Sequence, residues 1–135
     1  MTTNTPINRL KNASFKEVGS WHNASEQANQ IQFQPEQISN ETNVIYTFVA
    51  VANDKNEEVI YVGHTTQSLN HILRCYQKGT GGETFTKINA AIYGKLTNGQ
   101  VVKIFAFFDS GLLHQGDFRI DLALGLKASL ISAFK

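Results

Sequence analysis

The chain has 135 residues, enough for one domain with a substantial core, and its 12 basic and 11 acidic residues give a net charge of +1 that identifies no partner by itself. A single cysteine, Cys75, excludes an internal disulfide and a metal site built from several thiolates. No apolar run approaches transmembrane length, and the first residues lack the apolar segment of a secretory signal. We therefore expect a cytoplasmic protein in a reducing compartment.

The first 43 residues are rich in amides and poor in apolar side chains, and they contain twelve Asn or Gln. We expect residues 1–43 to form a polar N-terminal extension that is partly disordered or loosely docked. The apolar side chains available for docking are Phe15, Trp21, Ile31 and Phe33. A domain at residues 44–135 is expected to follow.

Two β-rich runs open this domain. "VIYTFVAV" at 44–51 predicts a buried strand, "ANDKNEE" is a polar turn, and "VIYVG" at 59–63 predicts a second strand. Two strands joined by a short turn are expected to pair as an antiparallel hairpin.

Two helices and a strand follow the hairpin. Leu69, Ile72, Leu73 and Tyr76 recur at helical spacing and predict a helix over 68–78, with Ser68 as its N-cap. "GTGGE" is a loop, and residues 84–99 predict a second helix that ends at "NG". "QVVKIFAFF" at 100–108 predicts the third strand. The expected fold is α+β: a small three-stranded antiparallel sheet flanked by helices.

The chain ends in a predicted helix that contains "LALGLKASLISAFK". Ile120, Leu124, Ile131 and Phe134 recur at helical spacing and form one apolar stripe, and Lys127 falls on that stripe. A charged group that faces inward is costly unless it is paired, hydrated or part of a site.

Positive charge gathers in the middle of the sequence. Residues 64–103 contain five Lys or Arg against one acid, Glu83. His71, Arg74 and Lys78 lie three and four residues apart, on one face of the first predicted helix. Such a face can contact phosphates, although a merely solvated helix surface is the simpler alternative. The candidate DNA-contacting residues are His64, Arg74, Lys78, Lys87 and Lys95.

The order of these motifs resembles the GIY-YIG nuclease superfamily, and most closely its small phage endonuclease II-type enzymes. The resemblance is carried by "NVIY", by "YVG" after a hairpin turn, by the amphipathic helix, and by "TKINAAIYGKLTNGQVVKIFAF" and "IDL". It covers residues 43–135.

The resemblance implies a magnesium-dependent phosphodiesterase that acts on DNA. In the family, the first-motif tyrosine, Tyr46 here, helps to deprotonate the attacking water, and the second, Tyr61, helps to hold the phosphate. An arginine on the following helix stabilises the charge that develops on phosphorus. A glutamate on the last helix holds the metal ion.

The sequence departs from this pattern at the arginine and at the glutamate. The glutamate position is occupied by Lys127, in "LKASLI". The arginine position falls on Ile72 when counted from Leu69 and on His71 when counted from Gly63, and Arg74 lies close by. A lysine has no lone pair for Mg²⁺, although it can place its own charge against a phosphate. Asp117 and Asp121 are alternative carboxylates.

Three functions remain open at the level of the sequence. The first is an active Mg²⁺-dependent DNA endonuclease that uses Tyr46, Tyr61, His71 or Arg74 and a different carboxylate. The second is a non-catalytic derivative that binds DNA through the same groove without cutting it, either a natural pseudoenzyme or a nuclease that carries an inactivating change at Lys127. The third is an interaction domain that does not bind DNA, in which the tyrosines are core residues.

Overall fold

The computed structural model describes residues 5–13, 15–23, 30–35 and 38–108, together with two short strands at 113–115 and 118–120. The helices are α1 (Pro6–Asn12), α2 (Leu69–Lys78) and α3 (Glu83–Thr97). The strands are β1 (Lys16–Asn23), β2 (Ile31–Gln34), β3 (Val44–Val51), β4 (Glu57–Thr65), β5 (Val101–Phe108), β6 (Leu113–Gln115) and β7 (Phe118–Ile120).

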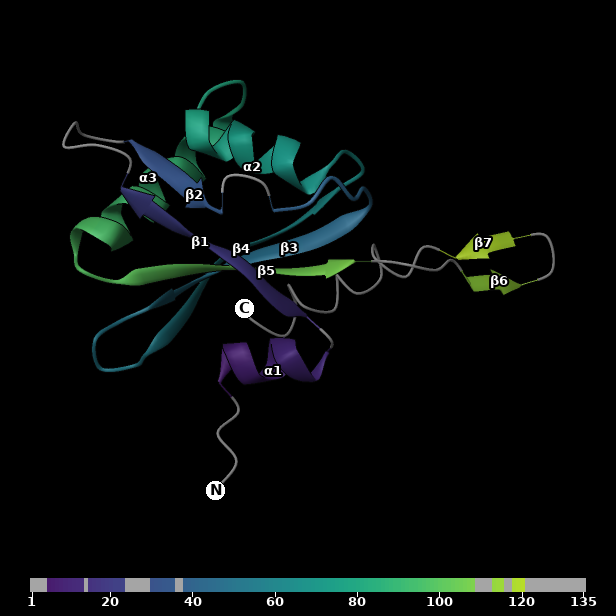
Figure 1. Ribbon diagram of the computed structural model, residues 1–135, viewed down its shortest axis with the longest axis horizontal. Helices are drawn as coiled ribbons and strands as arrows, with labels where there is room; N and C mark the ends of the chain where they lie inside the picture. Colours follow the sequence, from purple (N-terminus) through teal and green to yellow (C-terminus); the bar gives the residue numbers. More distant parts are fainter. Residues whose placement is uncertain are drawn as a thin grey trace.

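The centre of the fold is a five-stranded sheet with the order β2-β1-β5-β3-β4, in which every neighbouring pair is antiparallel (Figure 1). The expected hairpin is β3 and β4, which pair from Val44↔Thr65 to Val51↔Glu57 with one irregularity after Phe48. Strands β6 and β7 form a separate two-stranded sheet.

The expected three-stranded sheet is wrong, because β1 and β2 extend it to five strands. Both strands lie within residues 1–43, the segment that we expected to be a polar extension. Trp21 of β1 and Phe33 of β2 are buried and meet edge to face, with ring centroids 5.7 Å apart. A few apolar residues alternate with the many polar residues of this segment, and these apolar side chains pack on the main core. The division of the chain at residue 43 stays a prediction.

Helices cover the sheet on both sides. Figure 1 shows α2 and α3 on one face and α1 on the other. Along β3, Tyr46 and Phe48 join the core beneath α2 and α3, whereas Ile45 and Val49 join the smaller core beneath α1. Because both faces of the sheet are buried along β3, this strand is apolar over nearly its whole length, and its position could therefore be predicted from the sequence.

The predicted helix ends are confirmed where the structure describes them. The Ser68 side chain accepts a hydrogen bond from the His71 amide, as an N-cap does. Helix α2 ends at Gly79 in the left-handed conformation, and α3 ends at Asn98, followed by Gly99 with φ of 80°. The predicted last helix, with Lys127, lies outside the described residues. In the described part of the chain, no helix is long and apolar enough to cross a membrane.

Candidate functional site

Three tyrosines from three elements meet beneath α2. Tyr46 lies on β3, Tyr61 on β4 and Tyr76 on α2, and their ring centroids are 5.8–6.3 Å apart. The Tyr46 and Tyr76 hydroxyl oxygens are 2.7 Å apart and share a hydrogen bond. Both of these side chains are almost fully buried, whereas Tyr61 is half-buried. The structure therefore brings together the two tyrosines that the sequence predicted and adds a third.

Because Gly63 has no side chain, the Tyr46 ring can lie directly against the backbone of β4. The two residues are paired across β3 and β4, and a Cβ atom on Gly63 would overlap with the ring carbons and the hydroxyl oxygen of Tyr46. Any side chain here would displace the ring. The glycine of "YVG" is thus explained by a close approach between a tyrosine ring and the backbone.

Burial changes the acidity of two of the tyrosines. It raises the pKa of Tyr46 above its ordinary value, and the hydrogen bond from Tyr76 offsets only part of this rise. Burial also raises the pKa of Tyr76, and the neighbouring Tyr46 raises it further. Both hydroxyls are therefore protonated at neutral pH, and one of them donates the hydrogen bond that joins the pair.

The tyrosines line a pocket of about 340 Å³, which we call the tyrosine pocket. Its wall is completed by the N-terminal end of α3 and by one residue each from β4 and α2. The lining residues are Tyr46, Tyr61, His64, Ile72, Tyr76, Gly82, Glu83, Thr84 and Phe85. His64 is held there by a hydrogen bond of 2.7 Å between its Nε2 and the Asn43 side-chain oxygen.

The three positions weighed for the family's arginine lie on different sides of α2. Ile72 lines the tyrosine pocket. His71 is exposed, with its Nε2 3.9 Å from the Cys75 sulfur. Arg74 is exposed and lines a second pocket, on the flank of α2 that faces β2. Among the residues described, His64 is therefore the one basic side chain that lines the tyrosine pocket.

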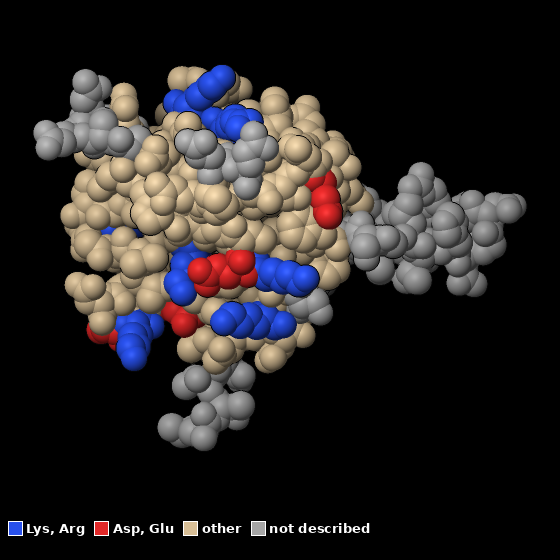
Figure 2. All heavy atoms as spheres, viewed as in Figure 1, with Lys and Arg blue, Asp and Glu red and all other residues tan. Residues whose placement is uncertain are grey.

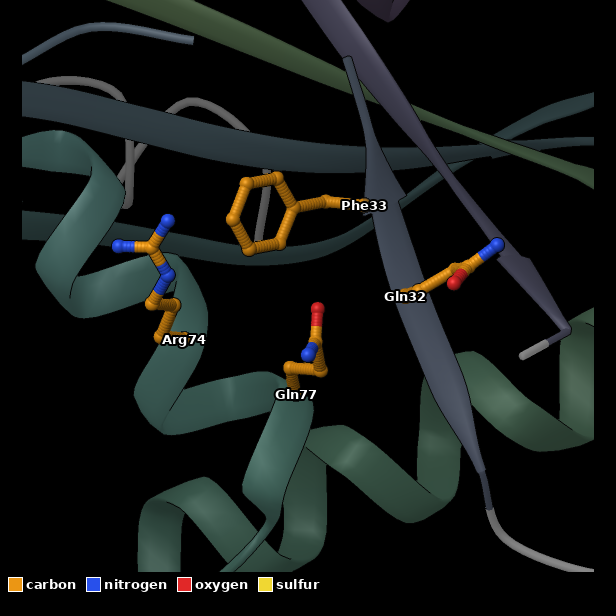
Figure 3. A pocket seen from close by; sticks show the side chains of 4 residues that line it. All are labelled: Gln32, Phe33, Arg74 and Gln77. Carbon is orange, nitrogen blue, oxygen red and sulfur yellow. The ribbon is translucent and has the colours of Figure 1, made fainter. Parts of the chain in front are cut away.

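We call this second pocket the Arg74 pocket. It has a volume of about 210 Å³ and is lined by Gln32, Phe33, Arg74 and Gln77. Figure 3 shows Arg74 and Gln77 extending from α2 beside the Phe33 ring, whereas Gln32 points away from them. This pocket could not be predicted from the sequence, because Gln32 and Phe33 lie in the segment expected to be loosely docked.

The other candidate DNA-contacting residues are spread over the surface. Lys78 is exposed near the end of α2, and Figure 2 shows basic side chains over this helix. Lys87 forms an ion pair of 2.8 Å with Glu83, and Lys95 forms one of 2.9 Å with Glu58. These two lysines are already partly neutralised, so α2 carries the more available positive charge.

The expected magnesium site needs several oxygen ligands, and the described part of the chain does not supply them. No group of three or more His, Cys, Asp and Glu residues gathers there. Glu83 is the one carboxylate among the residues that line the tyrosine pocket. This donor set does not fit a complete Mg²⁺ site. Lys127, Asp117 and Asp121 lie outside the described residues.

Sequence reasoning missed two lining groups of the tyrosine pocket. The helical spacing correctly predicts that Tyr76 lies on the apolar face of its helix, but it does not predict that the Tyr76 hydroxyl bonds to Tyr46. The sequence marks Glu83 only as the single acid of a basic segment, whereas the structure places it in the pocket lining. A tyrosine on an otherwise aliphatic helix face was the available signal, since a buried hydroxyl requires a partner.

Comparison with solved structures identifies the fold. The chain superposes on EndoII of bacteriophage T4, determined as a point mutant, with a TM-score of 0.67 and 18% sequence identity, over 95% of this chain and 93% of that one. The restriction endonuclease Hpy188I, determined in complex with product DNA, gives a TM-score of 0.49 and 12% identity, over 95% of this chain and 76% of that one. No protein-family model and no curated protein matches the sequence. The expected resemblance is confirmed for the fold: the chain has a GIY-YIG endonuclease-like fold over nearly its whole length.

Proposed function

We propose that this chain is a cytoplasmic DNA-binding domain on a GIY-YIG endonuclease scaffold, and that it cleaves DNA weakly or not at all in its present form. One observation carries the second part of the proposal: Ile72 lines the tyrosine pocket. Counted from Leu69, this is the position at which the family resemblance places an arginine. An aliphatic side chain cannot stabilise the charge that develops on phosphorus during cleavage.

The state of the tyrosines supports the same proposal. Burial raises the pKa of Tyr46 above its ordinary value, so removing the proton from its hydroxyl costs more than in an exposed tyrosine. A protonated phenol can donate a hydrogen bond to a phosphate oxygen but is a poor base for water. This arrangement therefore disfavours a role for Tyr46 as the general base for water.

Lys127 adds a third argument, from the sequence alone. It stands where the resemblance places the metal-binding glutamate. At a separation of ~4 Å and an effective dielectric near ~20, two unit charges interact by about 4 kcal/mol, and the repulsion of a divalent ion is larger. A lysine at this position disfavours Mg²⁺ and can instead bind the phosphate directly.

DNA binding is tested by titrating a labelled duplex with the chain at several salt concentrations. We expect an affinity that falls steeply with salt, because phosphate contacts release counterions. The variant Arg74→Ala, Lys78→Ala should bind more weakly and with a shallower salt dependence. Absence of salt-sensitive binding would leave the third function, an interaction domain that does not bind DNA, as the better account.

The role of Lys127 is tested by calorimetry with MgCl₂. We expect Lys127→Glu to take up Mg²⁺, whereas the unaltered chain and Lys127→Gln do not, because only the glutamate adds an anionic ligand. If Lys127→Glu shows no uptake of Mg²⁺, then Lys127 does not mark the family's metal position.

A second candidate function is an active Mg²⁺-dependent endonuclease that uses another carboxylate. It is favoured by the position of Glu83, which lines the tyrosine pocket and is paired with the exposed Lys87 only at the surface. This candidate predicts metal-dependent cleavage that is lost in Glu83→Gln and kept in Lys87→Ala.

A further inference from the structure

The Arg74 pocket is separate from the tyrosine pocket, and helix α2 lies between the two. Ile72 and Tyr76 line one flank of α2, and Arg74 and Gln77 line the other. The opposite wall of the Arg74 pocket is β2, which is an edge strand of the sheet. The pocket therefore opens at the margin of the sheet and does not share a residue with the tyrosine pocket.

Polar groups of the Arg74 pocket are left unused by the fold. Within the described ranges, the side chains of Arg74 and Gln77 make no hydrogen bond or ion pair, although Gln77 is half-buried. Helix α2 contains no acidic residue that could neutralise Arg74. Its nearest cation along the helix is Lys78, four residues on, and like charges at this spacing repel each other. A half-buried amide and an unpaired guanidinium are groups that a ligand can satisfy.

The chemistry of these groups fits the edge of a purine base better than it fits a phosphate alone. A guanidinium donates two parallel hydrogen bonds to the O6 and N7 atoms of guanine, and a glutamine amide both donates to and accepts from adenine. The Phe33 ring adds an apolar wall beside them (Figure 3). A phosphate would require donors only and would gain nothing from the Gln77 amide oxygen.

We infer that the Arg74 pocket binds an unpaired purine nucleotide and gives this chain a base preference that the tyrosine pocket does not provide. Arg74 and Gln77 contact the base edge. The inference rests on the proposed DNA-binding function, because it specifies which nucleotide of a bound DNA strand the Arg74 pocket would recognise. A strand that crosses α2 would meet His71 and Lys78 on the exposed surface between the pockets.

The test is an NMR titration of isotope-labelled full-length chain with four probes: deoxyguanosine monophosphate, deoxyadenosine monophosphate, thymidine monophosphate and inorganic phosphate. We expect the side-chain signals of Gln77 and Arg74 to shift with the two purine nucleotides and to shift at least about fivefold less with thymidine monophosphate or phosphate. Equal shifts with phosphate would overturn the inference and identify a plain anion site. No shift with any probe would also overturn it.

Variants separate base recognition from charge. Gln77→Ala and Arg74→Lys should each weaken purine binding at least about fivefold while leaving phosphate binding within about twofold, because they remove directional hydrogen bonds. The matched control is Lys11→Ala, an exposed residue of α1 on the other face of the sheet (Figure 1), which should leave the purine preference intact. A Gln77→Ala variant that keeps the full purine preference would contradict the assignment. All three side chains are at least partly exposed, so loss of folding is not expected.

The inference and the proposed function can fail separately. The purine titration needs no duplex DNA, so a purine preference without salt-sensitive duplex binding would overturn the proposed function alone. Salt-sensitive duplex binding with no purine preference would overturn the inference alone. The Tyr46→Phe variant should keep the purine preference, because Tyr46 lies in the other pocket.

Discussion

Gly63 and Tyr46 depend on each other at the centre of the tyrosine pocket. The Tyr46 ring occupies the space in which a side chain at position 63 would lie. Tyr46 is also fixed at its hydroxyl by Tyr76, so it has little room to move aside. A methyl group at position 63 is therefore expected to disturb the fold and the pocket together.

We expect Gly63→Ala to lower the free energy of unfolding by about 1–3 kcal/mol, the usual cost of overpacking a filled core. The measurement is urea denaturation followed by circular dichroism. Gly94→Ala is the matched control, because nothing lies within 4 Å of its added Cβ, and it should be neutral or stabilising by up to about 1 kcal/mol. Equal stability of the two variants would show that the ring does not require the glycine.

The buried tyrosines predict how stability depends on pH. Their pKa values are raised in the folded state, so the folded chain keeps protons that the unfolded chain releases around the ordinary tyrosine value of 10.0. Stability is therefore complete below this pH and falls as the pH rises above it. Urea midpoints measured from about pH 9 to about pH 11 should decline. The decline should be shallower in the double variant Tyr46→Phe, Tyr76→Phe, and an equally steep decline there would contradict the assignment.

At the scale of the elements, α2 is fixed at both ends by buried asparagines. The Asn70 side-chain oxygen accepts hydrogen bonds from the Ile38 and Ser39 amides at the start of the helix. The Asn89 side-chain nitrogen, from α3, donates to the Tyr76 and Gln77 carbonyl oxygens at its end. Because both pockets flank α2, these contacts position the lining residues on each side.

We expect Asn89→Ala to destabilise the chain by about 1–3 kcal/mol, because it leaves buried carbonyl groups without their donor. Thermal denaturation measures the effect. Lys87→Ala, on the exposed surface of the same helix, removes only a solvent-exposed ion pair and should change stability by less than about 0.5 kcal/mol. If Asn89→Ala proved as mild as Lys87→Ala, the C-terminal end of α2 would not depend on α3.

The sequence predicts those elements whose burial pattern is simple. Strand β3 is apolar on both faces, and α2 shows helical periodicity with a capping serine, so both were found. Strand β2 has four residues, "IQFQ", in which polar and apolar side chains alternate, and so short an alternation resembles a loop. It forms a strand because β1 pairs with it and because Phe33 packs on Trp21. Contacts with β1 and Trp21, which the local sequence pattern does not reveal, therefore determine that this segment is a strand.

The candidate site could also be predicted only in part. The motifs located Tyr46 and Tyr61, since they lie on strands that were expected to pair. The hydrogen bond of Tyr46 to Tyr76 and the separation of Arg74 from Ile72 depend on how α2 docks on the sheet. No spacing along the chain specifies that orientation, because a small rotation of the helix exchanges which side chain faces the pocket.

At the scale of the whole molecule, helices cover the described part of the five-stranded sheet on both faces, with α1 on one side and α2 and α3 on the other (Figure 1). Contact with a large partner therefore falls on helices and sheet edges. Helix α2 is the candidate surface, since it carries unpaired basic side chains and has a pocket on each flank. In the proposed complex, DNA held there meets a tyrosine pocket whose described lining contains no arginine.

The most direct test of this account is a nicking assay in which binding is measured in the same samples. Supercoiled plasmid is incubated with the unaltered chain and with Tyr46→Phe, with and without MgCl₂, at concentrations at which gel retardation shows the plasmid to be bound. We predict bound plasmid that stays supercoiled, with no more nicking by the unaltered chain than by Tyr46→Phe. Magnesium-dependent nicking by the unaltered chain that disappears in Tyr46→Phe would contradict the account and identify an active endonuclease.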